Sequence, residues 1–324
     1  MRNAAPQTIY LKDYTPFPWT VESVDLHFTL DPHATRVRSS IRFAPNPATS
    51  TATMMFLHGE ALALISATID GTPVAPQITD TGLTVDVPQG PFTWEAEVEI
   101  DPAGNTALEG LYMSNGMYCT QCEAEGFRKI TYYPDRPDVM SVFTVTIDGP
   151  HPVLLSNGNS LETAPQHAKW HDPWPKPAYL FALVAGDLIA HSSSFTTRSG
   201  RDVALNLYVR PGDEGKCAFG MQALKDSMEW DEDVYGREYD LDLFNIVAVD
   251  DFNMGAMENK GLAIFNSSAV LASQATSTDT NFERIEAIIA HEYFHNWTGN
   301  RITCRDWFQL CLKEGLTVYR DQEF

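Results

Sequence analysis

Two histidines and a glutamate form the pattern His-Glu-x-x-His at residues 291–295. On a helix, residues four apart are neighbours, so the imidazoles of His291 and His295 can reach one ion. Neutral imidazole is a common zinc ligand, and Glu292 would lie beside the metal, where a carboxylate can act as a general base. The same pattern also arises by chance on amphipathic helices, so a zinc site needs a further ligand.

A third candidate ligand, Glu314, follows His295 by 19 positions. It belongs to a second helical pattern, in which Trp307, Leu310 and Cys311 share its face. A carboxylate on an otherwise apolar face is costly to bury unless it is paired or binds a metal. The three side chains would complete a His2Glu zinc site and leave one coordination position for water.

The helix that carries the two histidines has candidate ends in the sequence. Thr280 and Glu283 have the spacing of a capping box, which predicts its N-terminus. Gly299 lies where a glycine often follows the last helical residue. Between them, an apolar face recurs at helical spacing, at Phe282, Ile285, Ile288 and Ile289.

The residues before about position 215 favour strands. Apolar and polar residues alternate in several runs, which include residues 24–30, 92–100 and 143–147. Asp-Gly and Asn-Gly pairs between such runs are typical of turns. Short alternating strands with frequent turns predict an all-β N-terminal domain, folded as a sandwich or a saddle-like curved sheet.

A proline-rich stretch at residues 171–177 marks a change in the pattern. We place the domain boundary near Asp187, which gives an all-β domain at 1–187 and a second domain at 188–324. Strands and helices mix in the second domain, which is therefore α/β or α+β. Its predicted elements are strands at residues 203–209 and 243–249 and a helix at residues 218–235.

Composition limits the possible partners. The formal net charge of −21 disfavours nucleic-acid binding and suits cationic small molecules. Five cysteines, an odd and low number, indicate a reducing compartment. The first residues show no apolar signal-peptide core, and no run reaches the ~18 apolar residues of a membrane span. These features predict a cytoplasmic protein that does not associate with a membrane.

Several segments carry a family resemblance. They are HEYFHNWTGN with LKEGLT downstream, GAMEN at residues 255–259 within NMGAMENKGLAIFNS, and TQCEAEGFRKITYYPDRPDV at residues 120–139. Together they resemble the gluzincin aminopeptidases, the bacterial members in particular, along essentially the whole chain. The resemblance implies an all-β N-terminal domain followed by the first part of a thermolysin-like α/β zinc metallopeptidase domain.

The resemblance also implies a role for each matching residue. One zinc ion would bind His291, His295 and Glu314, while Glu292 would take a proton from zinc-bound water and pass it to the leaving amine. The substrate would be a peptide with a free N-terminus, whose α-ammonium group binds Glu258. The other substrate-binding positions would be Gln121, Glu123, Met254, Gly255, Ala256 and Asn259.

These substrate-binding roles differ in kind. Gln121 and Glu123 would contribute to the same ammonium pocket as Glu258. The backbone of Gly255 and Ala256 would pair with the peptide main chain, as an edge strand does. Met254 would cushion the first side chain of the substrate, since methionine is soft and adaptable.

One family feature has no counterpart in this sequence. The family uses a tyrosine well downstream of the third ligand to stabilise the oxyanion, and the sequence ends at Phe324, ten residues after Glu314. We therefore expect the chain to be part of a longer polypeptide whose C-terminal portion completes the catalytic lobe. We also expect the chain alone to show little activity.

Three alternatives and one further motif accompany this prediction. A thermolysin-like endopeptidase shares the zinc ligands but needs no pocket for a free amine, and GAMEN argues against it. An epoxide-hydrolysing relative is disfavoured by Ala256, and a zinc-binding but inactive fragment is the third alternative. Cys119 and Cys122 form a lone CxxC pair, which we interpret as buried thiols without a metal.

Overall fold

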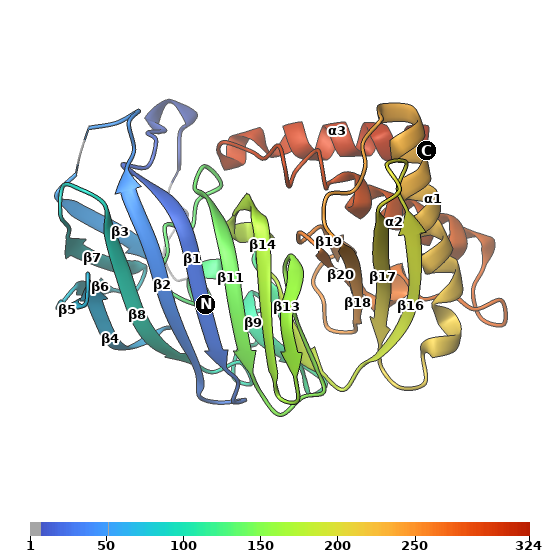
Figure 1. Ribbon diagram of the computed structural model, residues 1–324, viewed down its shortest axis with the longest axis horizontal. Coiled ribbons are helices and arrows are strands. Elements are labelled where there is room, and N and C mark those ends of the chain that lie inside the picture. Colours follow the sequence, from blue (N-terminus) through green and yellow to red (C-terminus); the bar gives the residue numbers. More distant parts are fainter. Residues whose placement is uncertain (1–7, 51) are drawn as a thin grey trace.

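The computed structural model describes residues 8–50 and 52–324. Strands that precede residue 187 occupy the left and centre of Figure 1, and the α-helices lie on the right and across the top. Two apolar cores hold these parts together. One lies among the strands of the first part, and the other lies between the second sheet and the helices.

The largest sheet has eight strands and follows the predicted alternation. In β1, Val24, Leu26 and Phe28 point into the core while their neighbours are more exposed. All neighbouring pairs are antiparallel except β1 and β11, which are parallel. In spatial order the strands are β13 (Asn159–Ala164), β14 (His167–Pro177), β11 (Met140–Asp148), β1 (Trp19–Thr29), β2 (Thr35–Pro45), β8 (Phe92–Ile100), β4 (Ala63–Ile69) and β5 (Thr72–Pro73).

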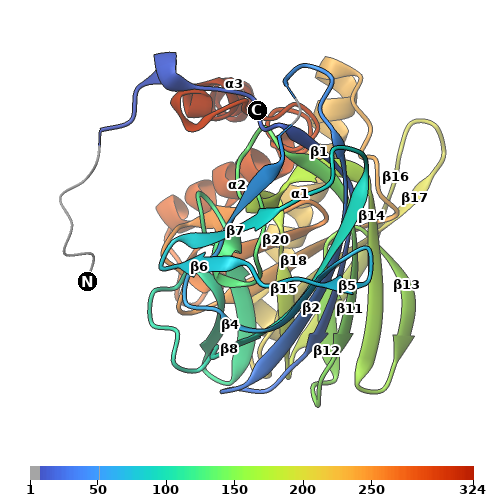
Figure 2. The same ribbon diagram turned by 90° about the vertical axis from the view of Figure 1, so that its left-hand side faces the viewer.

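Two smaller sheets complete the first part and share its core. Figure 2 views the molecule from the side of β6 and β7, with strands β1, β2 and β11 of the large sheet to their right. The three-stranded sheet contains β3 (Met54–His58), β7 (Gly82–Asp86) and β6 (Gln77–Thr79). The four-stranded sheet contains β12 (Val153–Ser156), β15 (Leu183–Gly186), β10 (Met117–Gln121) and β9 (Gly110–Ser114).

The second part is a five-stranded mixed sheet covered by helices. Its order is β16 (Ile189–Thr196), β17 (Asp202–Val209), β18 (Leu243–Val249), β20 (Leu262–Asn266) and β19 (Ala256–Met257), and β18 is parallel to both of its neighbours. The predicted strands at 203–209 and 243–249 are confirmed. The predicted boundary near Asp187 lies between β15 and β16 and stays a prediction.

Helices α1 (Ala218–Tyr235) and α2 (Asp279–Phe294) share the core of this sheet, and α3 (Leu310–Glu323) packs against α2. The predicted helix at 218–235 is confirmed, and it ends at Gly236, whose left-handed φ of 64° suits glycine. No helix in the described part of the chain is long and apolar enough to cross a membrane. Short 3-10 turns lie at Leu11–Asp13, Phe127–Lys129, Ala178–Leu180, Glu214–Lys216, Ser267–Ala269 and Trp307–Gln309.

Strand β18 joins the two cores because both of its faces are buried. Val247 and Val249 pack into the first core, and Ile246 and Ala248 pack into the second. A strand covered on both faces is apolar almost throughout, as its sequence predicted. Its neighbour β20, and β19 beyond it, also bury residues in both cores. This arrangement places the GAMEN segment near the end of β10, where Gln121 contacts Met254.

Candidate active site

Helix α2 brings His291, Glu292 and His295 to one place. Its N-terminus is capped by Thr278, which forms a capping box with Asn281. The predicted box at Thr280 and Glu283 is therefore wrong by two positions, because Asn281 supplies the reciprocal side-chain bond that a Glu usually makes. The predicted stop at Gly299 is also wrong, since α2 ends at Phe294 and tight turns follow.

The two imidazoles face each other through their Nε2 atoms, which are 2.9 Å apart. The Nδ1 atom of His291 lies 2.7 Å from a carboxylate oxygen of Asp321, and that of His295 lies 2.8 Å from the Thr298 carbonyl. Both of these oxygens only accept hydrogen bonds, so each Nδ1 donates a proton to its oxygen. The Nε2 lone pairs are then both directed to one point, as in a metal site with oriented ligands.

Glu314 approaches the same point from α3. Its Oε2 is 3.4 Å from Nε2 of His291 and 3.5 Å from Nε2 of His295, and the three candidate ligand atoms lie within 4.8 Å of one another. Burial alone would raise the pKa of Glu314, but hydrogen bonds with the two histidines lower it. Two imidazole nitrogens and one carboxylate oxygen form a donor set that fits zinc.

The surroundings of His291 favour a cation at this point. Burial would lower the pKa of His291, but the hydrogen bond with Glu314, the charge of Glu292 and the bond to Asp321 raise it to about 9. Two imidazole nitrogens 2.9 Å apart repel each other unless a proton or a metal ion lies between them. The residues present therefore fit the zinc ion that the sequence predicts.

The fourth residue of this group, Glu292, is buried beside the ligands. Its carboxylate lies within 4.8 Å of ligand atoms of both Glu258 and His295. Burial, followed by the charge of Glu258, raises the pKa of Glu292 well above its ordinary value. A carboxyl group in such an environment can both accept and return a proton.

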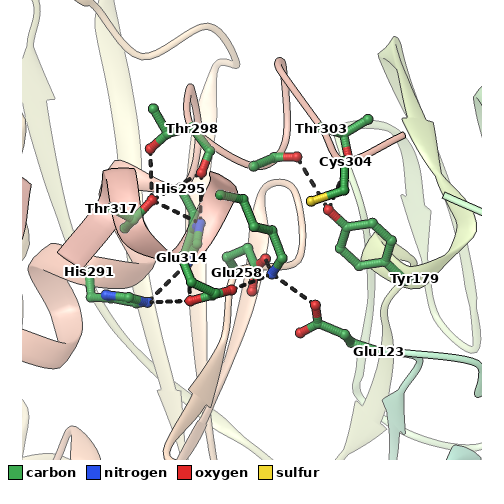
Figure 3. Close-up of polar contacts among 12 residues, drawn as sticks. Glu123, Tyr179, Glu258, His291, His295, Thr298, Thr303, Cys304, Glu314 and Thr317 are labelled. Carbon is green, nitrogen blue, oxygen red and sulfur yellow. Dashed lines mark hydrogen bonds and ion pairs between the residues drawn. The ribbon is translucent and has the colours of Figure 1, made fainter. Parts of the chain in front are cut away.

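A cluster of carboxylates, here called the carboxylate pocket, adjoins the two histidines, as the labelled side chains in Figure 3 show. Glu258 follows β19, Glu123 lies in the loop after β10, and both side chains are largely buried. Burial and the charge of Glu258 raise the pKa of Glu123 to about 7. For Glu258, burial opposes ionisation, but the charges of His295 and Lys313 lower its pKa.

Gln121 and Met254 contact each other at the edge of this pocket. Nε2 of Gln121 lies 3.2 Å from the sulfur of Met254, whose side chain is partly exposed. Oε1 of Gln121 is buried and has no hydrogen-bond partner within the described residues. A buried acceptor without a donor is costly, so this oxygen suits a ligand that brings an N–H group.

Backbone contacts hold the GAMEN segment in place. The side chain of Asn300 donates to the Glu258 carbonyl at 2.8 Å, and that of Asn259 donates to the Phe181 carbonyl at 3.3 Å. Asn259 thus contacts the protein backbone. Gly255 and Ala256 lie at or beside β19, the outermost strand of its sheet.

Sequence reasoning missed Lys313, which lies at the centre of the pocket. Its side chain is 1% exposed, and Nζ is 2.8 Å from Oε1 of Glu123, 2.5 Å from Oε1 of Glu258 and 2.7 Å from Oε1 of Glu314. The lysine stands inside the LKEGLT segment, directly before the third candidate ligand. The available signal in the sequence was the position of this charged residue directly before Glu314, a candidate metal ligand.

Asp321 was also missed, although it orients the first histidine. It lies on α3, seven positions after Glu314, so one helix supplies both a candidate ligand and the partner of another ligand. Arg320 bonds the carbonyl of Phe294 at 2.8 Å and forms a buried ion pair with Asp231 on α1. These bonds fix α3 against the end of α2.

Comparisons with known proteins decide the family. The Peptidase M1 N-terminal domain matches residues 20–180, and the Peptidase family M1 domain matches residues 219–324. The chain belongs to peptidase family M1. It thus contains the sheet-rich M1 N-terminal domain and the start of the M1 catalytic domain, which confirms the predicted fold.

The relatives in this M1 family are aminopeptidases. The chain is 56% identical to aminopeptidase N of Caulobacter vibrioides and 53% identical to aminopeptidase N of Escherichia coli, over 99% and 98% of its length. It covers 38% of each of these relatives. A crystal structure of Legionella pneumophila aminopeptidase A in complex with aspartic acid superposes with a TM-score of 0.93 at 36% identity, over 97% of this chain and 38% of that chain.

Proposed function

We propose that this chain is the N-terminal part of a zinc aminopeptidase that removes residues from the free N-terminus of peptides. The arrangement that carries the proposal is the carboxylate pocket of Glu123 and Glu258 directly beside the paired histidines. An aminopeptidase must hold a positive charge one residue away from the bond that it cleaves. Carboxylates that can bind a cation lie next to a candidate metal site here, so the substrate amine and the scissile bond could be held side by side.

The residues that would hold the metal are His291, His295 and Glu314, with Asp321 and the Thr298 carbonyl orienting the two imidazoles. Zinc in such a site supplies a water of lowered pKa and polarises the scissile carbonyl. The chain's own contribution is to aim both Nε2 atoms and one carboxylate oxygen at the same point. That point adjoins the pocket in which the substrate amine would lie.

Glu292 would carry the proton in this reaction. Its carboxylate takes a proton from the attacking water and delivers it to the nitrogen of the leaving amine. The buried position beside Glu258 and His295 supports this role, because it holds the carboxylate near both the water and the scissile bond.

Substrate binding would use the oxygens that line the pocket. Oε1 of Gln121 and the oxygens of Glu123 and Glu258 accept hydrogen bonds from the α-ammonium group. Strand β19 at the sheet edge offers its backbone to the peptide, and Met254 lies against Gln121 at the mouth of the pocket. Acetylation of the substrate amine removes the charge that this pocket recognises.

The protein that carries out the reaction is the full-length polypeptide, of which we propose this chain to be a part. Its C-terminal portion would complete the catalytic lobe and supply the oxyanion tyrosine that the family resemblance implies. A cytoplasmic location belongs to the same proposal, and the five cysteines are all free and four of them buried, including Cys119 and Cys122.

A pair of peptide assays tests the aminopeptidase proposal. One peptide is presented to the full-length protein with a free N-terminus and with an acetylated N-terminus. A buried charged contact is worth roughly 2–5 kcal/mol when one partner is truncated, so Glu258→Ala should lower kcat/KM for the free peptide about 30-fold or more. The acetylated peptide should be a poor substrate for both proteins. Equal cleavage of both peptides by the wild type would favour an endopeptidase instead.

A further inference from the structure

Lys313 occupies a position that the proposed reaction does not explain. Three carboxylate oxygens lie within 2.8 Å of Nζ in its ammonium group: Oε1 of Glu123, Oε1 of Glu258 and Oε1 of Glu314. Nζ donates a hydrogen bond to Glu258, and the contacts with Glu123 and Glu314 are ion pairs. These carboxylates come from the loop after β10, the segment after β19 and helix α3. The aromatic ring of Tyr179 lies below the same ammonium group, 5.4 Å from Nζ.

The oxygens around Lys313 form the kind of cage that binds a divalent cation. The candidate ligand atoms of Glu123, Glu258 and Glu314 lie within 4.8 Å of one another. Carboxylate oxygens are the preferred ligands of Mn²⁺, Mg²⁺ and Ca²⁺. Gln121 contacts the backbone of Glu123, whose carbonyl accepts from its Nε2 at 3.5 Å, and its Oε1 is buried without a donor within the described residues.

Glu314 links this cage to the paired histidines. One of its oxygens, Oε2, faces the imidazoles of His291 and His295, and the other, Oε1, forms an ion pair with Lys313. If Lys313 were absent, the same carboxylate could bridge two metal ions. The ammonium group thus lies where the second ion of a dinuclear site would lie.

We propose that Lys313 takes the place of a second divalent cation and so restricts this centre to one metal ion. The ammonium group neutralises part of the carboxylate charge without drawing both oxygens of each carboxylate to itself. Glu123 and Glu258 then keep their other oxygens for the ammonium group of a substrate. The inference rests on the proposed function, because it takes Glu314 as a zinc ligand.

Metal binding to Lys313→Ala tests the inference. The wild-type chain and the variant are first loaded with zinc and then titrated with Mn²⁺, which is followed by electron paramagnetic resonance and by elemental analysis. The wild type should hold about one zinc and no bound Mn²⁺. The variant should hold about one zinc and about one Mn²⁺, because an oxygen cage prefers Mn²⁺ whereas the histidine site retains zinc.

Two further variants serve as controls. Lys176→Ala removes a lysine that is equally buried but lies against the carboxylate of Asp172, and it should gain no Mn²⁺ site. Lys313→Ala combined with Glu123→Gln should lose the new site, because one ligand charge of the cage is gone. The double variant thus distinguishes a cage of these residues from Mn²⁺ bound elsewhere on an acidic surface.

The outcomes separate this inference from the proposed function. If the wild type binds no zinc, the proposed function fails. If it binds zinc and Lys313→Ala gains no Mn²⁺, or if the wild type binds Mn²⁺ as tightly as the variant, the inference is overturned. If Lys313→Ala does not fold by itself, added Mn²⁺ should bind and stabilise its folded state, so that the variant again unfolds cooperatively. Lys313→Ser is tested in the same way. Failure of both to fold in saturating Mn²⁺ overturns the inference too.

Discussion

Two lysines in this chain are equally buried, yet their surroundings differ. Lys176 in β14 and Lys313 in α3 are both 1% exposed. Lys176 pairs with Asp172 at 3.0 Å and lies 4.2 Å from the ring centre of Phe143, whereas Lys313 lies against three carboxylates. For Lys176, burial lowers the pKa despite Asp172. For Lys313, burial acts the same way, but the charges of Glu258 and Glu123 outweigh it and raise the pKa.

The difference separates a structural ion pair from a site that binds cations. In the N-terminal sheet, the positive charge of Lys176 is paired with the negative charge of Asp172, so no unpaired charge remains to bind a ligand. In the catalytic part, carboxylates outnumber the lysine, and the histidines beside them direct lone pairs to a common point. Burying such an excess of acceptors is unfavourable unless cations bind there. In the proposed function, this excess of carboxylates is balanced by the metal ion and the substrate amine.

The largest expected effect is the loss of kcat on substitution of Glu292. This substitution tests whether one of the excess carboxylates takes part in catalysis. Glu292→Gln in the full-length protein should keep its zinc and lose about 10²–10⁴-fold in kcat, because a positioned acid–base group contributes that much. Glu283→Gln, on the exposed side of the same helix, is the matched control. Steady-state kinetics and zinc content are measured on both. An unchanged kcat in Glu292→Gln removes this residue from the mechanism.

The next effect concerns the ion pair in β14. Lys176→Met leaves Asp172 buried without a partner and should lower the free energy of unfolding by about 3–5 kcal/mol. Lys176→Met combined with Asp172→Leu removes both charges and should recover most of that loss. Urea unfolding measures both variants. If Lys176→Met is as stable as the wild type, the ion pair of Lys176 and Asp172 does not stabilise the fold, and the comparison of the two lysines fails.

The smallest effect concerns the orientation of His291. Asp321→Asn keeps the size of the side chain but removes its charge, and it should weaken zinc binding about 10–100-fold, as loss of a ligand's hydrogen-bond partner does. Competition with a chelator measures the zinc dissociation constant. Glu323→Gln, near the end of the same helix, should leave it unchanged. Equal constants for Asp321→Asn and the wild type would show that the bond to Nδ1 has no influence on the metal.

Elements with a regular pattern could be predicted from the sequence. The helix at 218–235 and the strand at 243–249 have the predicted bounds, because a continuous apolar face or a continuous apolar run determines each. The ends of α2 were predicted wrongly. Thr278 with Asn281 competes with Thr280 and Glu283 for the cap, and propensity alone does not decide between positions two residues apart.

The candidate site could be predicted only where its spacing is local. His291 and His295 are one helical turn apart, so any helix brings them together. Lys313 and Glu123 are 190 positions apart, and their contact depends on how β10 and α3 pack. Asp321 resembles any other acidic residue of an exposed helix until the structure places it against Nδ1 of His291. Contacts of this kind have no periodic signal in the sequence.

The zinc content of His291→Ala tests the central claim most directly. The claim is that His291, His295 and Glu314 hold a metal ion, and removing one imidazole leaves two ligands. Elemental analysis of the purified chain should find about one zinc in the wild type and in His191→Ala, which changes a histidine on the strand β16, and almost none in His291→Ala. Full zinc occupancy in His291→Ala, with the variant folded, would contradict the account.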